Sequence, residues 1–432
     1  MKLVSYWQDT ASPAGDFRQT PVPEDVDVAI IGAGLTGLSA ALELARGGAR
    51  VAVLEAHHVG WGASGRNGGM ATTGMAIGLR QAISRYGREA AVRYYLEYDR
   101  AIETVEELVA EHALECSFAR HGKLSLALTP RDVAGMRETA RLVAEIGDLP
   151  DLQVLGPGEI RREIGSDFYC GGIVDPRGAG LHVGNFVTGL ARAAVSAGAT
   201  ICESAPAVSL QKTGVGHLVQ SARGAVRARE VLVATSGYTG ALTPWLRRRV
   251  IPVGSFIICT APLDDELATD LLPGGRMASD AKMLTYYFRL TPDRRLLFGG
   301  RARFALSSPD SDMKSSRILR QAMTKIFPQL SGVGIDYTWG GLVDITMDQM
   351  AHTGVRGTVN YSLGYSGHGV QMATHSGRET ARRLLGRAAS LPFERLGFPP
   401  VPGHFGRPWF LPLIGAGAHV IDRWNLVQGQ KA

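Results

Sequence analysis

The chain has 432 residues, of which 45% are hydrophobic and 20% are charged. This length and apolar content predict a globular protein with a large core, too long for a single compact domain. The formal net charge is +6 at pH 7, but the basic residues are scattered along the chain, which argues against nucleic acid as a partner.

Other simple features exclude further classes of protein. The chain contains no run of about 18 apolar residues, so we expect no transmembrane segment, and residues 1–17 have no apolar core of a signal peptide. Its four cysteines lie far apart and lack metal-ligand spacing, which predicts reduced thiols, no metal site and a cytoplasmic enzyme. The motifs of P-loop proteins, zinc peptidases and serine hydrolases are missing.

The first 55 residues predict a dinucleotide-binding βαβ unit. Residues 1–25 are polar and contain proline, which indicates an N-terminal arm. An apolar run then leads into GAGLTG at 32–37, and an amphipathic helix and a second apolar run, 51–54, follow before Glu55. The expected contacts to the dinucleotide are Gly32, Ala33, Gly34, Leu35, Thr36, Gly37, Glu55 and Ala56.

The residue types in this unit suit a pyrophosphate. Gly32 permits a tight turn, Gly34 lets the backbone approach the phosphates, and Gly37 allows the helix and strand to pack closely. Glu55 would accept hydrogen bonds from a ribose and would repel a 2′-phosphate, which argues against NADP. NAD and FAD both remain open at this point of the chain.

A glycine-rich loop, GWGASGRNGG at 60–69, follows Glu55. Such a loop can lay backbone N–H groups along a large planar cofactor, whereas an NAD dehydrogenase would proceed to another strand–helix unit. The loop therefore favours FAD. Trp61 either covers the flavin ring or packs against the protein.

The rest of the chain alternates between helical and extended patterns. Helices are expected over 80–115, after Pro130, within 181–197, over 312–328 and over 370–386. Strands are expected over 123–128, 198–201, 207–210, 216–219, 225–228, 231–235, 251–260, 284–290, 295–300, 339–345 and 359–363. The strands within 250–310 would form an antiparallel substrate sheet, and the last two would return toward the cofactor. The tail, 398–413, is either a packed extension or a peripheral membrane contact.

Three segments together resemble a known family: GAGLTG (32–37), GWGASGRNGG (60–69) and GYSGHGV (364–370). They are similar to the FAD-dependent oxidoreductases that include D-amino-acid oxidase, glycine oxidase and sarcosine oxidase. Two further segments, YFRLTPDRRLLFGG (287–300) and WGGLVDIT (339–346), are similar to the γ-glutamylputrescine oxidoreductase branch of that family.

The resemblance implies an α/β fold, α+β overall, in which a Rossmann-like FAD-binding domain is interleaved with an antiparallel-sheet substrate domain. The implied FAD-binding segments are 26–80, 151–240 and 331–390, and the implied substrate segments are 81–150 and 241–330. Residues 1–25 would form an arm and residues 391–432 a C-terminal extension.

The resemblance also implies further contacts to FAD. Arg66 and Asn67 would touch flavin or substrate, and a residue near Val208 would hold the adenine by its backbone. The helix that begins near residue 370 would direct N–H groups at the flavin edge that becomes negative on reduction. The implied residues are Gly62, Ala63, Ser64, Arg66, Asn67, Gly68, Gly69, Val208, Ala234, Thr235, Gly237, Gly364, Ser366, Gly367, His368, Gly369 and Val370.

The mode of flavin attachment follows from the cysteine positions. The sarcosine-oxidase branch attaches its flavin to a cysteine in the C-terminal part, and this chain has no cysteine after Cys259. We therefore expect non-covalent FAD, with a link through His57 or His58 as the alternative.

The flavin carries the oxidation of an amine, so no acid–base dyad is required of the protein. His368, in the C-terminal glycine-rich turn, either contacts the flavin and handles a proton or fixes the turn. Tyr287 and Arg289 share one face of their predicted strand and Tyr286 takes the other, and either face could line the site. His352 falls where chains of this family approach the active site.

Departures from the family's pattern bear on the substrate. The lysine that binds the substrate carboxylate in sarcosine oxidase corresponds to Gln371, and the arginine of glycine and D-amino-acid oxidases corresponds to Gly367. Because a desolvated cation–carboxylate pair can decide specificity, we expect an amine without an α-carboxylate, such as γ-glutamylputrescine. Residues 348–352 lack the Arg and Pro that this branch often carries, which leaves another amine open.

Alternatives remain at the level of the sequence. The substrate alternatives are glycine, sarcosine or a D-amino acid, and the functional alternatives are an NAD-dependent dehydrogenase and a non-catalytic flavoprotein. The electron acceptor is O2, with formation of H2O2, or a quinone or other electron carrier. The oligomeric state stays open.

Overall fold

Two eight-stranded sheets form the framework of the protein, whose computed structural model describes residues 1–300, 307–406 and 408–429. The first sheet has the order β17 (His352–Arg356), β18 (Val359–Leu363), β11 (Gly224–Val233), β1 (Asp25–Ile31), β2 (Val51–Leu54) and β8 (Thr200–Cys202), and β10 (Gly216–Ser221) pairs with both β11 and β9 (Ala207–Thr213). The second has the order β16 (Ile335–Ile345), β12 (Ile251–Thr260), β15 (Leu296–Gly300), β14 (Tyr286–Leu290), β13 (Met277–Asp280), β4 (Lys123–Ala127), β6 (Gly171–Asp175) and β5 (Gln153–Leu155). The short strands β3 (Met70–Ala71) and β7 (Ala179–Gly180) pair separately.

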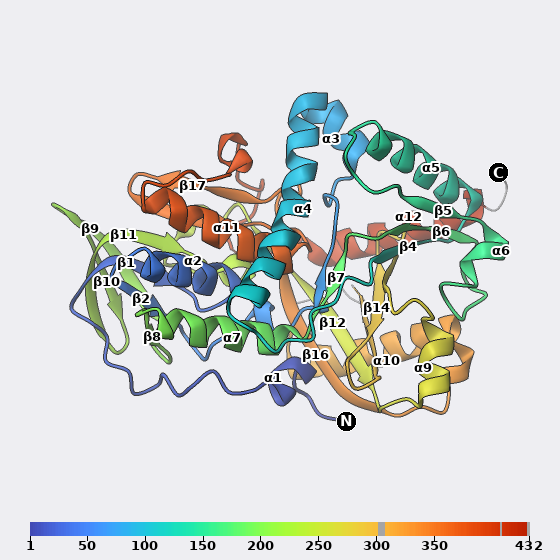
Figure 1. Ribbon diagram of the computed structural model, residues 1–432, viewed down its shortest axis with the longest axis horizontal. Helices are drawn as coiled ribbons and strands as arrows, with labels where there is room; N and C mark the ends of the chain where they lie inside the picture. The colour runs from blue at the N-terminus through green and yellow to red at the C-terminus, as the bar shows by residue number, and fades with distance from the viewer. Residues whose placement is uncertain (301–306, 407, 430–432) are drawn as a thin grey trace.

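Helices surround both sheets. They are α1 (Tyr6–Thr10), α2 (Leu35–Arg46), α3 (Leu79–Tyr86), α4 (Arg88–Glu111), α5 (Pro130–Ala144), α6 (Pro157–Ile160), α7 (Val183–Ser196), α8 (Pro244–Arg247), α9 (Asp265–Leu271), α10 (Pro309–Ile326), α11 (Gly369–Leu384) and α12 (Leu411–Gly429). Short 3-10 turns are η1 (Ala63–Gly65), η2 (Ser236–Tyr238), η3 (Pro328–Leu330) and η4 (Pro392–Arg395). Figure 1 shows the first sheet on the left, the second on the right and α4 rising between them.

Strand β1 lies inside the first sheet and directs its carboxyl end at the GAGLTG turn. It pairs in parallel with β2 on one side and with β11 on the other. Val28 and Ile30 belong to the large core that contains α2, whereas Ala29 and Ile31 belong to a second core on the opposite face. Burial on both faces explains why the strand reads as one apolar run.

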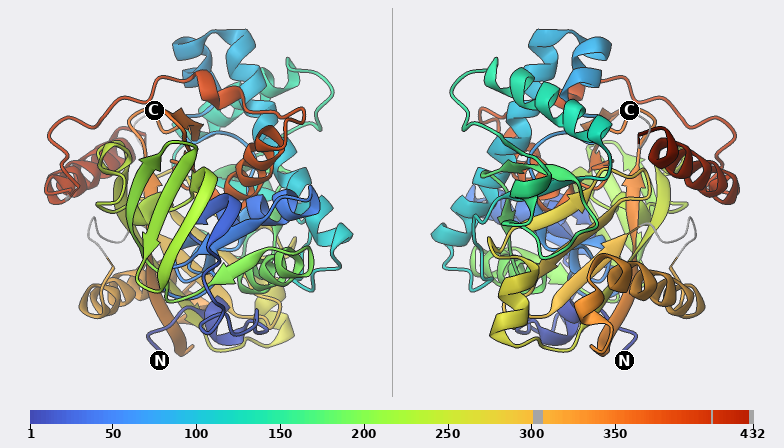
Figure 2. Two further views of the ribbon diagram at one scale, coloured as in Figure 1. Left: turned by 90° about the vertical axis from the view of Figure 1, so that its left-hand side faces the viewer. Right: turned by 90° about the vertical axis from the view of Figure 1, so that its right-hand side faces the viewer.

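The second sheet has its own core. Its buried residues come from strands of the sheet and from helices α9 and α10 that cover it, including Phe288, Phe298 and Phe327. The rings of Phe288 and Phe298 stack at 5.6 Å. The right-hand view of Figure 2 looks onto this side of the molecule, and the left-hand view looks onto the first sheet. The predicted α/β fold class with two sheets is confirmed.

Three strands pair in the second sheet although the predicted division of the chain places them in FAD-binding segments. Strand β16, which lies within the predicted FAD-binding segment 331–390, pairs with β12 along the edge of the second sheet. Strands β5 and β6, within 151–240, also belong to the second sheet. Sequence patterns give the alternation of a strand but not its partner, because pairing is decided by distant residues. Residues 301–306 of the predicted substrate segment, and 407 and 430–432 of the predicted extension, lie outside the described residues.

Several elements also differ locally from the predictions. The short strands expected at 225–228 and 231–235 form one strand, β11, which pairs antiparallel with β10 near its start and parallel with β1 further along. Helix α10 begins three residues before the expected start, after the capping residue Ser308. Helix α9 and strands β13 and β17 were not predicted.

The C-terminal tail packs against the second sheet in part. Val401 and Leu411 are buried in a small core with Ile251 and Val253 of β12. Asp422 of α12 accepts the backbone N–H groups of Met283 and Leu284 at 2.8 and 3.0 Å. Among the described residues, no helix is long and apolar enough to cross a membrane, and no cluster of His, Cys, Asp and Glu could hold a metal ion.

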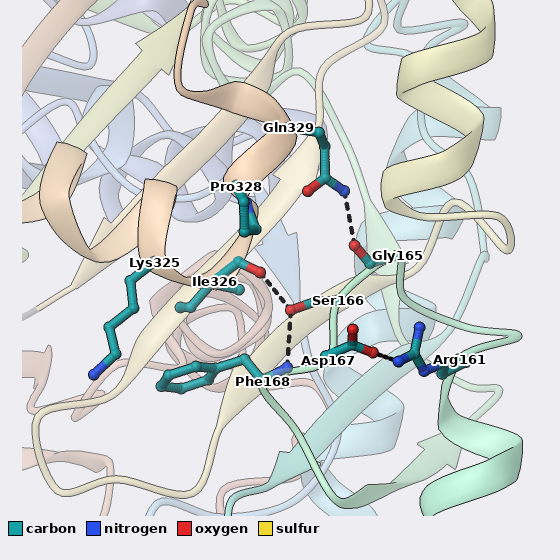
Figure 3. A pocket seen from close by; sticks show the side chains of 9 residues that line it. All are labelled: Arg161, Gly165, Ser166, Asp167, Phe168, Lys325, Ile326, Pro328 and Gln329. Atoms are coloured by element: carbon teal, nitrogen blue, oxygen red, sulfur yellow. Dashed lines mark hydrogen bonds and ion pairs between the residues drawn. The ribbon is translucent and has the colours of Figure 1, made fainter.

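A hollow of about 400 Å³ lies between α6 and the end of α10 (Figure 3). Several of its polar groups are already paired: Ser166 Oγ donates to the carbonyl of Ile326, and Gln329 Nε2 donates to the carbonyl of Gly165 at 2.8 Å. None of the predicted site residues lines this hollow, so it carries no argument about the chemistry.

The N-terminal segment is not a free arm. Ser5, Tyr6 and Trp7 are buried, and helix α1 packs on α7. His182 connects α1 to α7. Its Nδ1 accepts the N–H of Asn185 and so caps α7, and its Nε2 donates to Thr10 Oγ1 at 3.0 Å. The polar composition of residues 1–25 predicts an N-terminal arm, and the structure shows that residues 5–7 of this segment are buried against the body of the protein.

We expect His182 to make stability depend on pH. Burial lowers the pKa of His182 below its ordinary value of 6.5, so the neutral ring stabilises the folded protein fully above about pH 6.5 and this stabilisation is lost as the pH falls toward the lowered pKa. Thermal unfolding should show a smaller loss of Tm from pH 7 to pH 5 in His182→Asn, which keeps a capping oxygen, than in the wild type. Equal losses in both proteins would contradict this assignment.

Candidate flavin and substrate site

The turn after β1 has a shape that only small residues allow. Gly32 has a φ of +109°, and a Cβ there would lie 2.8 Å from the carbonyl oxygen of Ala234. A Cβ on Gly37 would lie 2.0 Å from the carbonyl oxygen of Gly32. Gly34 precedes α2 and has no side chain that could cap the helix. The first N–H groups of α2 are therefore not capped by the preceding residue, and N–H groups at a helix start suit a phosphate.

Glu55 lies beside this turn at the end of β2. Its Oε2 accepts the N–H of Ala33 at 2.8 Å and its Oε1 accepts the N–H of His57 at 2.9 Å. Ser64 Oγ accepts the N–H of Leu35 at 2.9 Å, which ties the glycine-rich loop to the start of α2. These bonds fix the carboxylate beside the glycine turn, and the contacts of Glu55 and Ala56 with the dinucleotide stay predictions.

Side chains of the 60–69 loop bind mainly the protein's own backbone. Arg66 donates to the carbonyls of Trp61 at 2.7 Å and Gly340 at 3.2 Å. Asn67 donates to the carbonyls of Ala63 and Ser64 and accepts the N–H of Gly69 at 2.8 Å. The structure therefore gives Arg66 and Asn67 a role in shaping the loop, and their contact with flavin or substrate stays a prediction.

Trp61 packs between two charged or polar neighbours. The His57 ring stacks on it with ring centres 3.8 Å apart, and the Arg66 guanidinium lies 5.1 Å from its ring centre. Gly62 faces Tyr238 at a distance that leaves little room for a side chain. These contacts favour the packing role of Trp61 over that of a cover on the flavin ring.

The C-terminal glycine-rich turn is anchored by Asp344 of β16. Asp344 Oδ2 accepts the N–H of Gly364 and the hydroxyl of Ser236, both at 2.6 Å, and its carbonyl accepts the N–H of Ser366 at 3.0 Å. Complete burial raises the pKa of Asp344 above its ordinary value. Gly364 and Gly367 have φ values of +82° and +99°, a backbone region that favours glycine, so a side chain at either position would strain the turn.

Tyr365 joins this turn to the dinucleotide helix. Its hydroxyl lies 2.7 Å from Thr36 Oγ1 and 2.9 Å from Ser362 Oγ. A Cβ on Gly377 of α11 would lie 2.2 Å from the carbonyl oxygen of Thr36. Helices α2 and α11 therefore pack closely. Helix α2 begins after Gly34 and helix α11 begins after His368, and the bond between Thr36 and Tyr365 brings these two helix starts into one site.

Two buried polar atoms at or beside the start of α11 find no partner among the described residues. Gln371 is fully buried, and its Nε2 donates to the carbonyl of Thr72 at 2.6 Å, whereas its Oε1 has no hydrogen-bond partner in the part of the chain that the structure describes. The same holds for the hydroxyl of Tyr98 on α4, which is also fully buried and whose ring meets the His368 ring edge-on at 5.4 Å. His368 precedes α11 without capping it by its side chain. Buried polar atoms of this kind are normally satisfied, so the residues here fit a bound cofactor and substrate.

The structure settles which face of β14 lies toward the glycine-rich loop. A Cβ on Gly68 would lie 3.1 Å from the ring of Tyr287, and Arg289 donates to the carbonyls of Gly69 and Leu181. Tyr286 points the other way and packs on Phe298. Burial lowers the pKa of Arg289 to about 10.

Other predicted residues have structural contacts or positions of their own. His352 is buried, pairs through Nε2 with Asp348 at 3.0 Å and stacks on Phe398 at 3.9 Å, which favours a structural role. Val208 on β9 has a side chain that is 60% exposed. The remaining predicted residues, Ala234, Thr235, Gly237, Gly369 and Val370, follow β11 or begin α11.

Sequence reasoning missed five residues that shape the site. They are Ser236, Asp344 and Tyr365, which hold the C-terminal turn, Tyr98, and Trp7, whose Nε1 donates to the carbonyl of Asn67 at 2.7 Å. A lone acid within the apolar run at 339–345 was a signal for Asp344, because an unpaired buried carboxylate is costly. Nothing local marks Tyr98, which lies on a long helix.

Comparison with known proteins gives consistent results. A family model described as FAD dependent oxidoreductase matches residues 27–383. The chain is 34% identical over 417 residues to gamma-glutamylputrescine oxidoreductase of Escherichia coli (strain K12), covering 96% of each chain, and 35% identical over 405 residues to the probable oxidoreductase OrdL of Haemophilus influenzae, covering 92% of each. Its fold is similar to that of glycine oxidase from Geobacillus kaustophilus, with a TM-score of 0.69, 21% identity and coverage of 87% of this chain and 100% of the other.

Proposed function

Because the chain belongs to the family of FAD-dependent oxidoreductases and is an amine oxidoreductase, we propose that its substrate is an amine whose reacting carbon carries no carboxylate. γ-Glutamylputrescine or a similar amine fits this description. The oxidised C–N bond would then be hydrolysed by water to an aldehyde and an amine or ammonia. FAD is bound without a covalent link in this proposal.

The chemistry that FAD supplies when bound is the acceptance, at its N5, of the hydride that leaves the carbon next to nitrogen. The protein binds the cofactor and the amine, orients them toward each other and stabilises the negative charge on the flavin. Gly32 and Gly34 admit the pyrophosphate, Glu55 binds the ribose, and the start of α11 directs its N–H groups at the flavin edge that becomes negative. Tyr287, on the face of β14 that meets the loop, borders the space for the amine.

The hydrogen bonding of the Gln371 amide is the observation that supports the substrate proposal. Its amide nitrogen is committed to Thr72, which leaves a buried oxygen acceptor rather than a cation at this position. An acceptor suits the N–H of an amine, whereas a carboxylate beside the reacting carbon would meet no positive charge from Gln371 or Gly367.

An experiment with the purified enzyme tests this proposal. The protein is mixed without oxygen with γ-glutamylputrescine, putrescine, sarcosine, glycine and D-alanine, and bleaching of the flavin is followed before and after air is admitted. Fast bleaching by the diamine compounds alone supports the proposal, and recovery in air identifies O2 as an acceptor. Slow recovery in air with fast recovery on adding a quinone identifies a dehydrogenase.

A second candidate substrate is an amino acid held through its carboxylate by Arg289. The observation in its favour is that, in the part of the chain that the structure describes, no acidic side chain pairs with Arg289, which contacts backbone carbonyls. Bleaching by glycine, sarcosine or D-alanine at a rate comparable to the diamine compounds would favour this candidate and overturn the proposal.

Replacing Gln371 should change this selectivity. Gln371→Lys places a cation at the buried position, and we expect the ratio of kcat/KM for sarcosine to that for the diamine substrate to rise by about tenfold or more, since a charge-assisted hydrogen bond contributes roughly 1.5–3 kcal/mol. Gln371→Met is the matched control, because it keeps the length and lacks the charge. A ratio that rises equally in both variants would show that loss of the amide, not gain of charge, causes the change.

A further inference from the structure

Four backbone carbonyls of the glycine-rich loop receive hydrogen bonds from the N-terminal segment. Ser5 Oγ donates to the carbonyl of Gly65 at 2.6 Å, and Trp7 Nε1 donates to that of Asn67 at 2.7 Å. Gln8 Nε2 lies 3.1 and 3.2 Å from the carbonyls of Gly60 and Trp61. Ser5 and Trp7 are fully buried, so the two bonds that they donate are the better shielded from water.

The N-terminal segment packs closely against the loop. A Cβ on Gly65 or Gly69 would first meet a backbone oxygen, that of Gly60 or Leu181, and next Gln8 Nε2 at 2.9 Å or the Trp7 ring at 3.0 Å. The shape of the loop itself requires both glycines, and the N-terminal side chains lie at close range beside them. A loop with this much glycine loses much conformational entropy when it becomes ordered. Hydrogen-bond donors that already hold its carbonyls lower the entropy loss that accompanies binding of a cofactor.

The same segment is also tied to the substrate sheet. Tyr6 donates its hydroxyl to Asp293, in the turn between β14 and β15, at 2.6 Å. Lys2 pairs with β16 through backbone bonds to Asp336 at 2.6 Å and Thr338 at 2.9 Å. In Figure 1, α1 lies beneath the junction of the two halves, near β16. The N-terminal segment thus links the loop to the sheet that carries Tyr287.

We propose that residues 5–8 are positioning residues of the flavin site, which hold the 60–69 loop in its FAD-binding shape against the substrate sheet. Neither the family model, which begins at residue 27, nor the glycine motifs assign this role to them. Their side chains act through the loop and do not touch the reacting atoms.

Two variants remove the donors while keeping the bulk. Trp7→Phe retains a ring in the buried position, and Gln8→Met retains the length of the side chain at a half-buried one. Trp409→Phe is the matched control, because Trp409 Nε1 also donates to a backbone carbonyl, that of Gly403 at 3.1 Å, outside the loop. Each protein is stripped of FAD, and the dissociation constant for FAD is measured by quenching of flavin fluorescence together with the visible circular dichroism of the bound flavin.

We expect the dissociation constant for FAD to rise about tenfold or more in the Trp7→Phe/Gln8→Met double variant, with an altered flavin dichroism, and to stay within about threefold of wild type in Trp409→Phe. A double variant that binds FAD within about threefold of wild type, whatever its Tm, overturns the proposal. If the double variant does not fold, Gln8→Met alone decides, with a threefold rise expected and no change contradicting the role.

Discussion

The Gly34→Val variant is expected to fold but to be isolated without FAD and without amine oxidation. A Cβ on Gly34 would lie 2.8 Å from Ser64 Oγ, the atom that accepts the N–H of Leu35. Valine therefore displaces a loop contact and also places methyl groups in the approach path to the start of α2. The dissociation constant for FAD, measured by flavin fluorescence, should rise more than about a hundredfold, which is about 2.8 kcal/mol.

A matched substitution in open space separates this effect from a general cost of valine. Gly135 lies in α5, where a Cβ would meet nothing within 4 Å, so Gly135→Val should retain FAD with wild-type affinity. If Gly34→Val bound FAD as tightly as Gly135→Val, the pyrophosphate would not lie at this turn.

The second large loss is expected from Asp344→Ala. This substitution leaves the N–H of Gly364 and the hydroxyl of Ser236 without their buried acceptor, and each unsatisfied buried donor costs roughly 1–3 kcal/mol. The free energy of unfolding of the apoprotein, measured in urea, should fall by about 3 kcal/mol. Because the turn that precedes α11 loses its anchor, the affinity for FAD should fall as well.

Asp344→Asn tests whether the acceptor or the charge matters. The amide retains an oxygen that can accept the N–H of Gly364, so we expect a smaller loss of stability than in Asp344→Ala and flavin binding closer to wild type. Asp151→Ala, in an exposed loop, serves as the control and should change neither quantity. Equal stability of Asp344→Ala and Asp151→Ala would mean that the turn does not depend on this anchor.

Local patterns sufficed for the elements around the dinucleotide turn. The strand, the GAGLTG turn, helix α2 and strand β2 lie where the spacing predicts them, because these residues interact with close neighbours in the chain. Helices α4, α5, α7 and α11 were equally clear, since their apolar period is long enough to be unambiguous.

Patterns that depend on distant partners were less informative. Strand β16 reads as an apolar strand, but only its ladder with β12 places it in the second sheet. Residues 1–25 read as polar, yet Trp7 is buried because the loop at 60–69 and helix α7 enclose it. Strands β13 and β17 were not predicted, and each is held in its sheet by neighbours that the local sequence does not reveal.

The sequence by itself determined the dinucleotide-binding unit and, through its resemblance to FAD-dependent oxidoreductases, indicated FAD and the oxidation of an amine. Glycines that cannot be replaced in a tight turn, an acid at the end of the second strand and a second glycine-rich turn form a signature that depends on local geometry. The face of β14 that meets the loop, the anchor at Asp344 and the role of residues 5–8 were decided only by tertiary structure. The physical reason is distance along the chain: each depends on at least one hydrogen bond between residues more than 50 positions apart, and no local pattern records where such residues meet.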